Sequence, residues 1–256
     1  MKANGQAGES VKEASKAMNE LGVRGLLVRV GIDSACGSWN APVDLATGSF
    51  VYVPIPESRP LRRGMRCGYN ELIQPLARMG TTLPAALRGT PTHLDPDFEF
   101  LTYGDQGSRA GRIREVLGTG NGFIAFYASL RDVNSGELID ALIGFYHVAK
   151  IFEVENFPRS RWHQNAHTRR TSATGDVVAV GQKGRSGRLA RCIVIGRFRD
   201  RAHRVDQAVL KAWGGLSVRD GYIQRSARLP EFVKPRRFLD WLNTQNPQFI
   251  AENNLA

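Results

Sequence analysis

The stretch from Leu117 to Val154 constrains the fold more than any other part of the chain, because two apolar runs flank a polar turn. The first run, Phe123 to Leu130, is rich in aromatic residues and follows three glycines, Gly118, Gly120 and Gly122. The second run, Ala141 to Val148, has the same character and is interrupted once by Gly144. Such runs on either side of turn-forming residues predict two strands of a β-hairpin. A glycine inside a strand indicates a bulge or the close approach of another part of the chain.

The rest of the chain predicts shorter strands mixed with helices. Short apolar runs predict strands at residues 25–31, 49–53, 177–180 and 192–195, and helical spacing predicts helices at 10–21, 71–79, 108–117, 205–213 and 235–242. This order predicts an α+β protein with a mixed or barrel-like central sheet and peripheral N- and C-terminal helices. We expect residues 1–22 to form a tail with a peripheral helix and residues 23–256 to form a single domain.

The central hairpin resembles that of PUA-like barrels of the EVE and ASCH type. The resemblance rests on the strand carrying Phe126 and Tyr127, the polar insertion, and the strand from Ile143 to Val148. It implies a fold that binds nucleic acid and, as in several of those proteins, receives a flipped or modified base in an aromatic pocket.

The net charge of +11 is concentrated in the C-terminal part of the chain. Residues 1–150 carry 16 Lys and Arg against 15 Asp and Glu, whereas residues 151–256 carry 19 against 9. The basic region 158–204 holds 12 cations, of which 11 are arginine. The guanidinium group of arginine forms paired hydrogen bonds with phosphates and stacks on bases. This pattern predicts a polyanionic partner, with a solvated basic face as the alternative.

Composition also narrows the location and the chemistry. The chain lacks an apolar run of 18 residues and the apolar segment of a signal peptide, which predicts a cytoplasmic protein with no membrane partner. Its three cysteines, Cys36, Cys67 and Cys192, are far apart and show no metal-ligand spacing. A disulfide framework or a structural zinc site is therefore not expected.

Polar residues in two segments are candidates for catalysis. Asp33 follows a predicted strand, and His93, Asp95, Asp97 and Glu99 alternate, so that an extended chain would put them on one face. Such a set can supply a general acid and base or bind a divalent cation. The alternatives are an Asx turn closed by Asp33 and a polar loop that leads into a strand with Phe98 facing inward. The candidate catalytic residues are Asp33, His93, Asp95, Asp97 and Asp105.

The segment from Arg161 to Arg170 combines an indole, two amides, two histidines and flanking arginines, which is a mixture suited to nucleic acid. His163 and His167 have the spacing of a metal-binding helix, but the glutamate of an HExxH motif and a third ligand nearby are missing, so we assign no metal ligands; the cofactor stays unknown. The candidate nucleic-acid-binding residues are Arg161, Trp162, Gln164, Asn165, Arg169, Arg170, Arg185 and Arg188. The candidate base-stacking residues are Trp39, Tyr52, Tyr127 and Trp162.

Taken together, the ordered motifs resemble the nucleotide modification associated domain 3 family, also described as putative DNA base hypermodification proteins. The motifs are Gly31-Ile-Asp33, Gly48-Ser-Phe50 with Pro54-Ile-Pro-Glu57, His93-Leu-Asp95-Pro-Asp97 with Tyr103-Gly-Asp105, and Phe126-Tyr127 followed by Ile143-Gly144. The family was delineated largely because its genes lie near those of DNA-modifying enzymes in phages and bacteria. The resemblance therefore implies a role in the context of DNA modification, and it carries over no active-site assignment.

We therefore predict a protein that binds nucleic acid, DNA rather than RNA, and handles a modified or modifiable base or nucleotide. Two alternatives remain: a non-catalytic reader of modified bases with a PUA-like pocket, and an RNA-binding protein.

Overall fold

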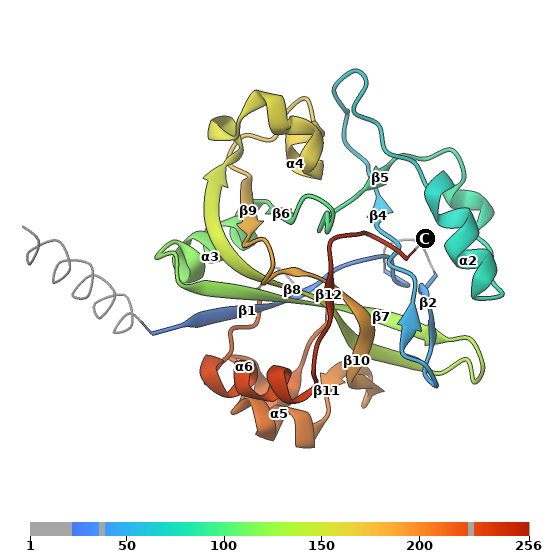
Figure 1. Ribbon diagram of the computed structural model, residues 1–256, viewed down its shortest axis with the longest axis vertical. Helices are drawn as coiled ribbons and strands as arrows, with labels where there is room; N and C mark the ends of the chain where they lie inside the picture. The colour runs from blue at the N-terminus through green and yellow to red at the C-terminus, as the bar shows by residue number, and fades with distance from the viewer. Residues whose placement is uncertain (1–21, 36–38, 225–227, 256) are drawn as a thin grey trace, which may run out of the picture.

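The computed structural model describes residues 22–35, 39–224 and 228–255, and its central feature is the hairpin of β7 (Gly122–Asp132) and β8 (Leu138–Glu153). The two strands pair antiparallel from Gly122 opposite Val148 to Arg131 opposite Leu138. They lie in the middle of a ten-stranded mixed sheet (Figure 1). The predicted hairpin is confirmed, and β8 runs five residues beyond the predicted strand.

The remaining strands extend the hairpin on both sides. On the β7 side, β1 (Arg24–Arg29) and β2 (Pro42–Asp44) pair with it in parallel, and β2 pairs with β3 (Ser49–Phe50). On the β8 side, one half of the strand pairs with β10 (Gly187–Arg199) and the other with β9 (Val177–Gly181). β10 also pairs with β11 (Ala202–Val205) and β12 (Phe249–Ile250), β9 pairs with β6 (Thr102–Asp105), and β4 (Ile55–Pro56) and β5 (Thr92–His93) form a separate pair.

The predicted α+β class with a mixed sheet is confirmed, and the sheet is open rather than closed into a barrel. The predicted C-terminal helices are present as α5 (Gln207–Trp213) and α6 (Pro235–Thr244). The predicted N-terminal helix at 10–21 lies outside the described residues. The resemblance to PUA-like folds stays a prediction.

Side chains of β7 alternate between two cores because successive residues of a strand point to opposite faces. Phe123, Ala125 and Tyr127 pack against α5 and α6, which cover one face in Figure 1. Ile124 and Phe126 face the other core, which includes the buried residues of α3 (Gly107–Leu117). The hairpin is therefore covered on both faces.

Gly144 meets both expectations for a glycine within a strand. Phe126 pairs with Gly144 and Tyr127 with Leu142, so the register shifts by one residue at this point. A Cβ atom at Gly144 would also lie 2.3 Å from the ring of Phe98. Only glycine fits under this ring, which is fully buried.

Short helices lie in the connections between these elements. They are η1 (Asn70–Leu72), α2 (Ile73–Arg78), η2 (Ala85–Leu87), η3 (Val154–Asn156), η4 (Arg159–Gln164), α4 (Ala166–Arg169) and η5 (Arg219–Gly221). In the part of the chain that the structure describes, none of the helices is long and apolar enough to cross a membrane.

Candidate active site

Three buried side chains from two segments that are distant in the sequence converge beside the sheet. His93 ends β5, Asp95 follows two residues later, and His167 lies in α4. The Oδ2 atom of Asp95 is 3.8 Å from Nε2 of His93 and 3.5 Å from Nε2 of His167. Within the described ranges these three residues are the one His, Cys, Asp or Glu group whose potential ligand atoms all lie within 4.8 Å of one another.

A second carboxylate fixes the orientation of each imidazole. Nδ1 of His93 is 2.7 Å from Oε2 of Glu57, and Nδ1 of His167 is 2.6 Å from Oδ2 of Asp176. A carboxylate only accepts hydrogen bonds when it is ionised, so each Nδ1 donates. Both Nε2 atoms are therefore directed at Asp95.

Asp95 is itself held from two sides. The backbone N–H of Gly104 donates to its two oxygens at 2.9 and 3.0 Å, and Nδ2 of Asn165 donates to Oδ1 at 3.1 Å. Asn165 also begins α4, because its side chain accepts from the backbone N–H of His167. A Cβ atom at Gly104 would lie 2.4 Å from the ring of His167, so β6 approaches this helix closely because it has glycine there.

Arg170 completes the buried network. Its guanidinium donates to both oxygens of Glu57, at 3.0 and 3.2 Å. Burial raises the pKa of Glu57, but the hydrogen bonds from His93 and Arg170 outweigh it and lower that pKa to about 2. Burial lowers the pKa of His93, whereas the hydrogen bonds of His167 with Asp176 and Asp95 outweigh burial and raise its pKa.

The cluster opens into a polar cavity of about 230 Å³. The ionisable residues that line it are Arg29, Glu57, Arg59, His93, Asp95, Tyr103, Asp105, Arg109, His167 and Arg170. Arg29 is 3.0 Å from Asp33 and Arg109 is 2.8 Å from Asp105, whereas the side chain of Arg59 is exposed. The cavity thus combines groups for acid–base or metal chemistry with several guanidinium groups.

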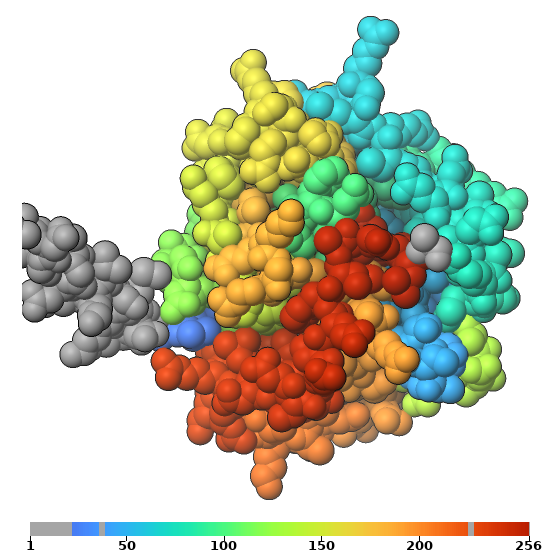
Figure 2. All heavy atoms as spheres, viewed as in Figure 1, coloured from blue at the N-terminus to red at the C-terminus, as the bar shows by residue number. Residues whose placement is uncertain are grey.

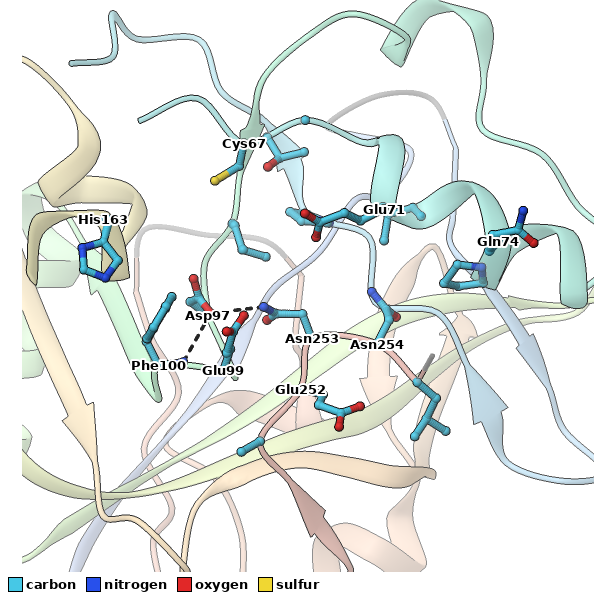
Figure 3. A pocket seen from close by; sticks show the side chains of 18 of the residues that line it. Cys67, Glu71, Gln74, Asp97, Glu99, Phe100, His163, Glu252, Asn253 and Asn254 are labelled. Carbon is cyan, nitrogen blue, oxygen red and sulfur yellow. Dashed lines mark hydrogen bonds between the residues drawn. The ribbon is translucent and has the colours of Figure 1, made fainter. Parts of the chain in front are cut away.

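A larger cavity of about 880 Å³ lies on the other side of the segment 92–97. Figure 3 shows it between α2, η4 and the C-terminal segment, with Asp97, Cys67 and His163 around it. Because the segment is extended where it ends β5, Thr92 and Leu94 face this cavity while His93 and Asp95 face the smaller one. The segment is therefore the wall between the two cavities.

Exposed and half-buried arginines gather on the loop 58–66 and on η4; of these, Arg59 lines the smaller cavity and Arg66 lines the larger one. The loop 58–66 lies against α4, since the backbone N–H of Arg62 donates to the carbonyl of Arg169 at 2.8 Å. Figure 2 shows this loop in cyan beside the yellow segment that contains η4. The guanidinium of Arg62 stacks 3.9 Å from the ring centroid of Trp162, and that of Arg159 lies 5.6 Å away. We call Arg59, Arg62, Arg63, Arg66, Arg159 and Arg161 the arginine rim.

The predicted catalytic residues are distributed over three places. His93, Asp95 and Asp105 line the smaller cavity. Asp97 lines the larger one, where it pairs with Arg169 at 2.9 Å. Asp33 is buried, pairs with Arg29, and accepts from the backbone N–H of Ala35 at 2.9 Å, which is the Asx turn considered as an alternative. The expected single face of alternating residues therefore ends after Asp95.

The predicted nucleic-acid-binding residues fall into two groups, one at least partly exposed and one buried. Arg161, Trp162 and Gln164 are half-buried and Arg185 is exposed. The buried members take part in internal contacts: Asn165 with Asp95, Arg169 with Asp97, Arg170 with Glu57, and Arg188 with the carbonyl and ring of Phe50. Their role in binding stays a prediction.

Of the predicted base-stacking residues, Trp39 is half-buried and packs against the main core. Tyr52 and Tyr127 are buried, and the hydroxyl of Tyr127 donates to the carbonyl of Ile223. Trp162 is the remaining member, and arginines already cover its ring. A flipped base would therefore have no exposed tyrosine of this set to stack on.

Three residues of the buried network, Glu57, His167 and Asp176, were not among the predicted catalytic residues. Glu57 stood out only within a motif, His167 only as a partner of His163, and Asp176 not at all. The spacing His93-Leu-Asp95 was the available signal, because two potential ligands two residues apart often need a third from elsewhere. The sequence offers no means of finding that third residue in a distant segment.

Comparisons with known proteins identify one family. The sequence model described as nucleotide modification associated domain 3 matches residues 24–253. None of the curated proteins matches the chain, and neither does any solved structure. The matched span includes β1, the hairpin, the buried cluster and both cavities.

Proposed function

The chain belongs to the nucleotide modification associated domain 3 family, and from this premise we propose that it is an enzyme that modifies a base or nucleotide of DNA. The reaction takes place in the smaller cavity, at His93, Asp95 and His167. The observation that supports this proposal is the buried cluster itself, in which two oriented imidazoles and a carboxylate open into an arginine-lined cavity.

The cluster supports catalysis over simple reading of a base. A reader needs shape, stacking and hydrogen bonds, but no set of ionisable groups held in place by further buried charges. Here Glu57, Asp176 and Arg170 all orient the two histidines, and each is less than a tenth exposed. Buried ionisable groups of this kind are costly unless they are paired, so they are typical of functional sites.

The arginine rim supports a nucleic-acid substrate. Guanidinium groups bind phosphates and release counterions, and the side chains of Arg59, Arg63 and Arg66 are exposed. Arg59 lines the smaller cavity and Arg66 the larger one, and the loop that carries all three packs on α4, which carries His167. A strand bound along the rim would therefore pass the mouth of the smaller cavity, so a base turned out of the strand can enter it.

Nucleoside mass spectrometry tests the proposal even though the donor molecule is unidentified. We would express the protein in a bacterial host, digest DNA and RNA separately, and compare the nucleosides with those from cells that express His93→Ala. The expected result is a new nucleoside in DNA that is absent with the variant. His163→Ala, whose side chain faces the larger cavity, serves as the matched control and retains the product.

A different distribution of products would point to the alternatives. A new nucleoside in RNA alone would make RNA the substrate. Unchanged nucleosides, combined with preferential binding of a modified base that is lost in Trp162→Ala, would support the reader and refute the enzyme.

A further inference from the structure

We propose that Nε2 of His93, Nε2 of His167 and Oδ2 of Asp95 bind one divalent transition-metal ion in the smaller cavity. Only the role of this metal in catalysis rests on the proposed function; the binding of the metal does not. Its test needs no substrate, because metal binding is measured on the protein alone.

The first argument is the convergence of acceptors. Glu57 and Asp176 take the Nδ1 protons of the two histidines, which leaves each neutral imidazole with a lone pair on Nε2. These two nitrogens and an oxygen of Asp95 are acceptors that lie within 4.8 Å of one another, and three acceptors repel one another unless a cation lies between them. In metal sites a carboxylate on the far nitrogen of a histidine ligand has this same orienting role.

The second argument is charge. The buried network contains three carboxylates, from Glu57, Asp95 and Asp176, and one guanidinium, from Arg170. A metal ion binds only neutral histidines, and in that state the network holds two excess negative charges less than a tenth exposed to solvent, which is unfavourable without compensation. A divalent cation balances them.

The third argument is geometry. Metal–ligand distances of about 2.0–2.1 Å in a tetrahedral site place neighbouring ligand atoms about 3.4 Å apart. The separations between Asp95 Oδ2 and the Nε2 atoms of His167 and His93 are 3.5 and 3.8 Å, and all three ligand atoms lie within 4.8 Å of one another, so a metal ion would have to draw the two imidazoles together. Two histidines and one carboxylate are the ligand set of open zinc sites and of non-heme iron sites, which leave further positions for water or substrate.

The competing explanation is a protonated His167 that donates to Asp95 in place of a metal. Cobalt(II) distinguishes the two, because it replaces zinc or iron at such sites and absorbs visible light with a spectrum that depends on its ligands. We would titrate untagged, chelator-treated protein with cobalt(II) under anaerobic conditions. In parallel, element analysis would determine the metal content of the protein as purified.

We expect one cobalt ion per chain, a visible absorption band and an increase in melting temperature on binding. His167→Ala should lose the band, and Asp176→Asn, which removes an orienting charge, should weaken binding about 10- to 100-fold. The matched control His163→Ala lies outside the cluster and should bind as the wild type does. If His167→Ala does not fold, the Asp176→Asn titration alone decides.

Two results would overturn the metal site. One is wild-type protein that shows neither absorption nor a melting shift at millimolar cobalt. The other is binding that Asp176→Asn and Asp95→Asn leave unchanged. These results are distinct from a failure of the proposed function: a metal-loaded protein that leaves all nucleosides unchanged refutes the enzyme only, and a product without a bound metal refutes the metal only.

Discussion

Replacing Gly144 by alanine should destabilise the protein, although the same substitution in an open strand position is favourable. The new Cβ atom would lie 2.3 Å from one carbon of the Phe98 ring and 2.5 Å from another. The shorter distance falls about 1 Å short of the 3.4 Å at which ordinary contact begins. The ring, the strand or both must move.

The ring of Phe98 has little room to move. Its centroid is 5.4 Å from that of Tyr52, 5.9 Å from Phe126 and 5.8 Å from Tyr146, and all four rings are buried. Extra carbon in a well-packed core costs about 1–3 kcal/mol. The lower entropy of the unfolded alanine chain returns about 0.4–1 kcal/mol. We therefore expect a net loss of about 1–2 kcal/mol.

For a chain of this size each kcal/mol lowers the melting temperature by about 2–4 °C, so we expect a decrease of about 2–8 °C by calorimetry. Gly111→Ala is the matched control: it lies in α3 with nothing within 4 Å of its Cβ, and should stabilise by about 0.5–1 kcal/mol. Adding Phe98→Leu to Gly144→Ala should recover part of the loss relative to the two single variants. A melting temperature at or above that of the wild type in Gly144→Ala would refute the reasoning.

Single side chains provide four further tests. Arg188 is fully buried and donates to the carbonyl of Phe50, so Arg188→Ala should cost about 2–4 kcal/mol in urea unfolding, whereas the exposed Arg185→Ala should stay within about 0.5 kcal/mol. Burial raises the pKa of Cys192 to about 12, so iodoacetamide at pH 8 should modify it only after unfolding, as seen by peptide mass spectrometry. Burial and Arg185 lower the pKa of His147 to about 4, below its unfolded value of about 6.5; protons then bind the unfolded state preferentially, so stability should fall from pH 6.5 towards 4, and less in His147→Gln. Arg63→Ala should weaken duplex DNA binding in gel shifts and reduce the slope of log affinity against log salt by about 0.9 if it contacts one phosphate; an unchanged slope would remove it from the arginine rim's binding surface.

The fold follows from local patterns to a considerable extent. The aromatic-rich apolar run from Phe123 to Leu130 and the glycines around the hairpin sufficed to predict β7 and β8, since these signals reside in neighbouring residues. The helix that begins at Gly107 and the stop after Trp213 were predicted for the same reason, and Gly214 adopts φ of 77° at that stop. The strand expected at 49–53 is shorter, because after Phe50 the chain leaves its partner.

The site could be predicted only in part, because its members are brought together by tertiary contacts. His93 and Asp95 share a segment, so their polarity and spacing marked them as candidates. The partners Glu57, His167 and Asp176 reach them through β4, α4 and the turn before β9, and no local pattern encodes that arrangement. The same limit affects the arginines: charge is visible in the sequence, whereas the burial of Arg188 depends on where β10 crosses Phe50.

The pairing of charges in the smaller cavity bears on which part of a nucleotide enters it. Arg29 lies against Asp33, Arg109 against Asp105 and Arg170 against Glu57, so an entering phosphate would have to compete with a carboxylate for each guanidinium. The exposed guanidinium groups of the arginine rim, such as those of Arg59 and Arg63, would bind phosphate without that competition. A base is uncharged and, unlike a duplex, matches a cavity of about 230 Å³. We therefore expect the backbone to lie along the rim and the base to enter the cavity, an arrangement that requires the nucleotide to be turned out of its stack.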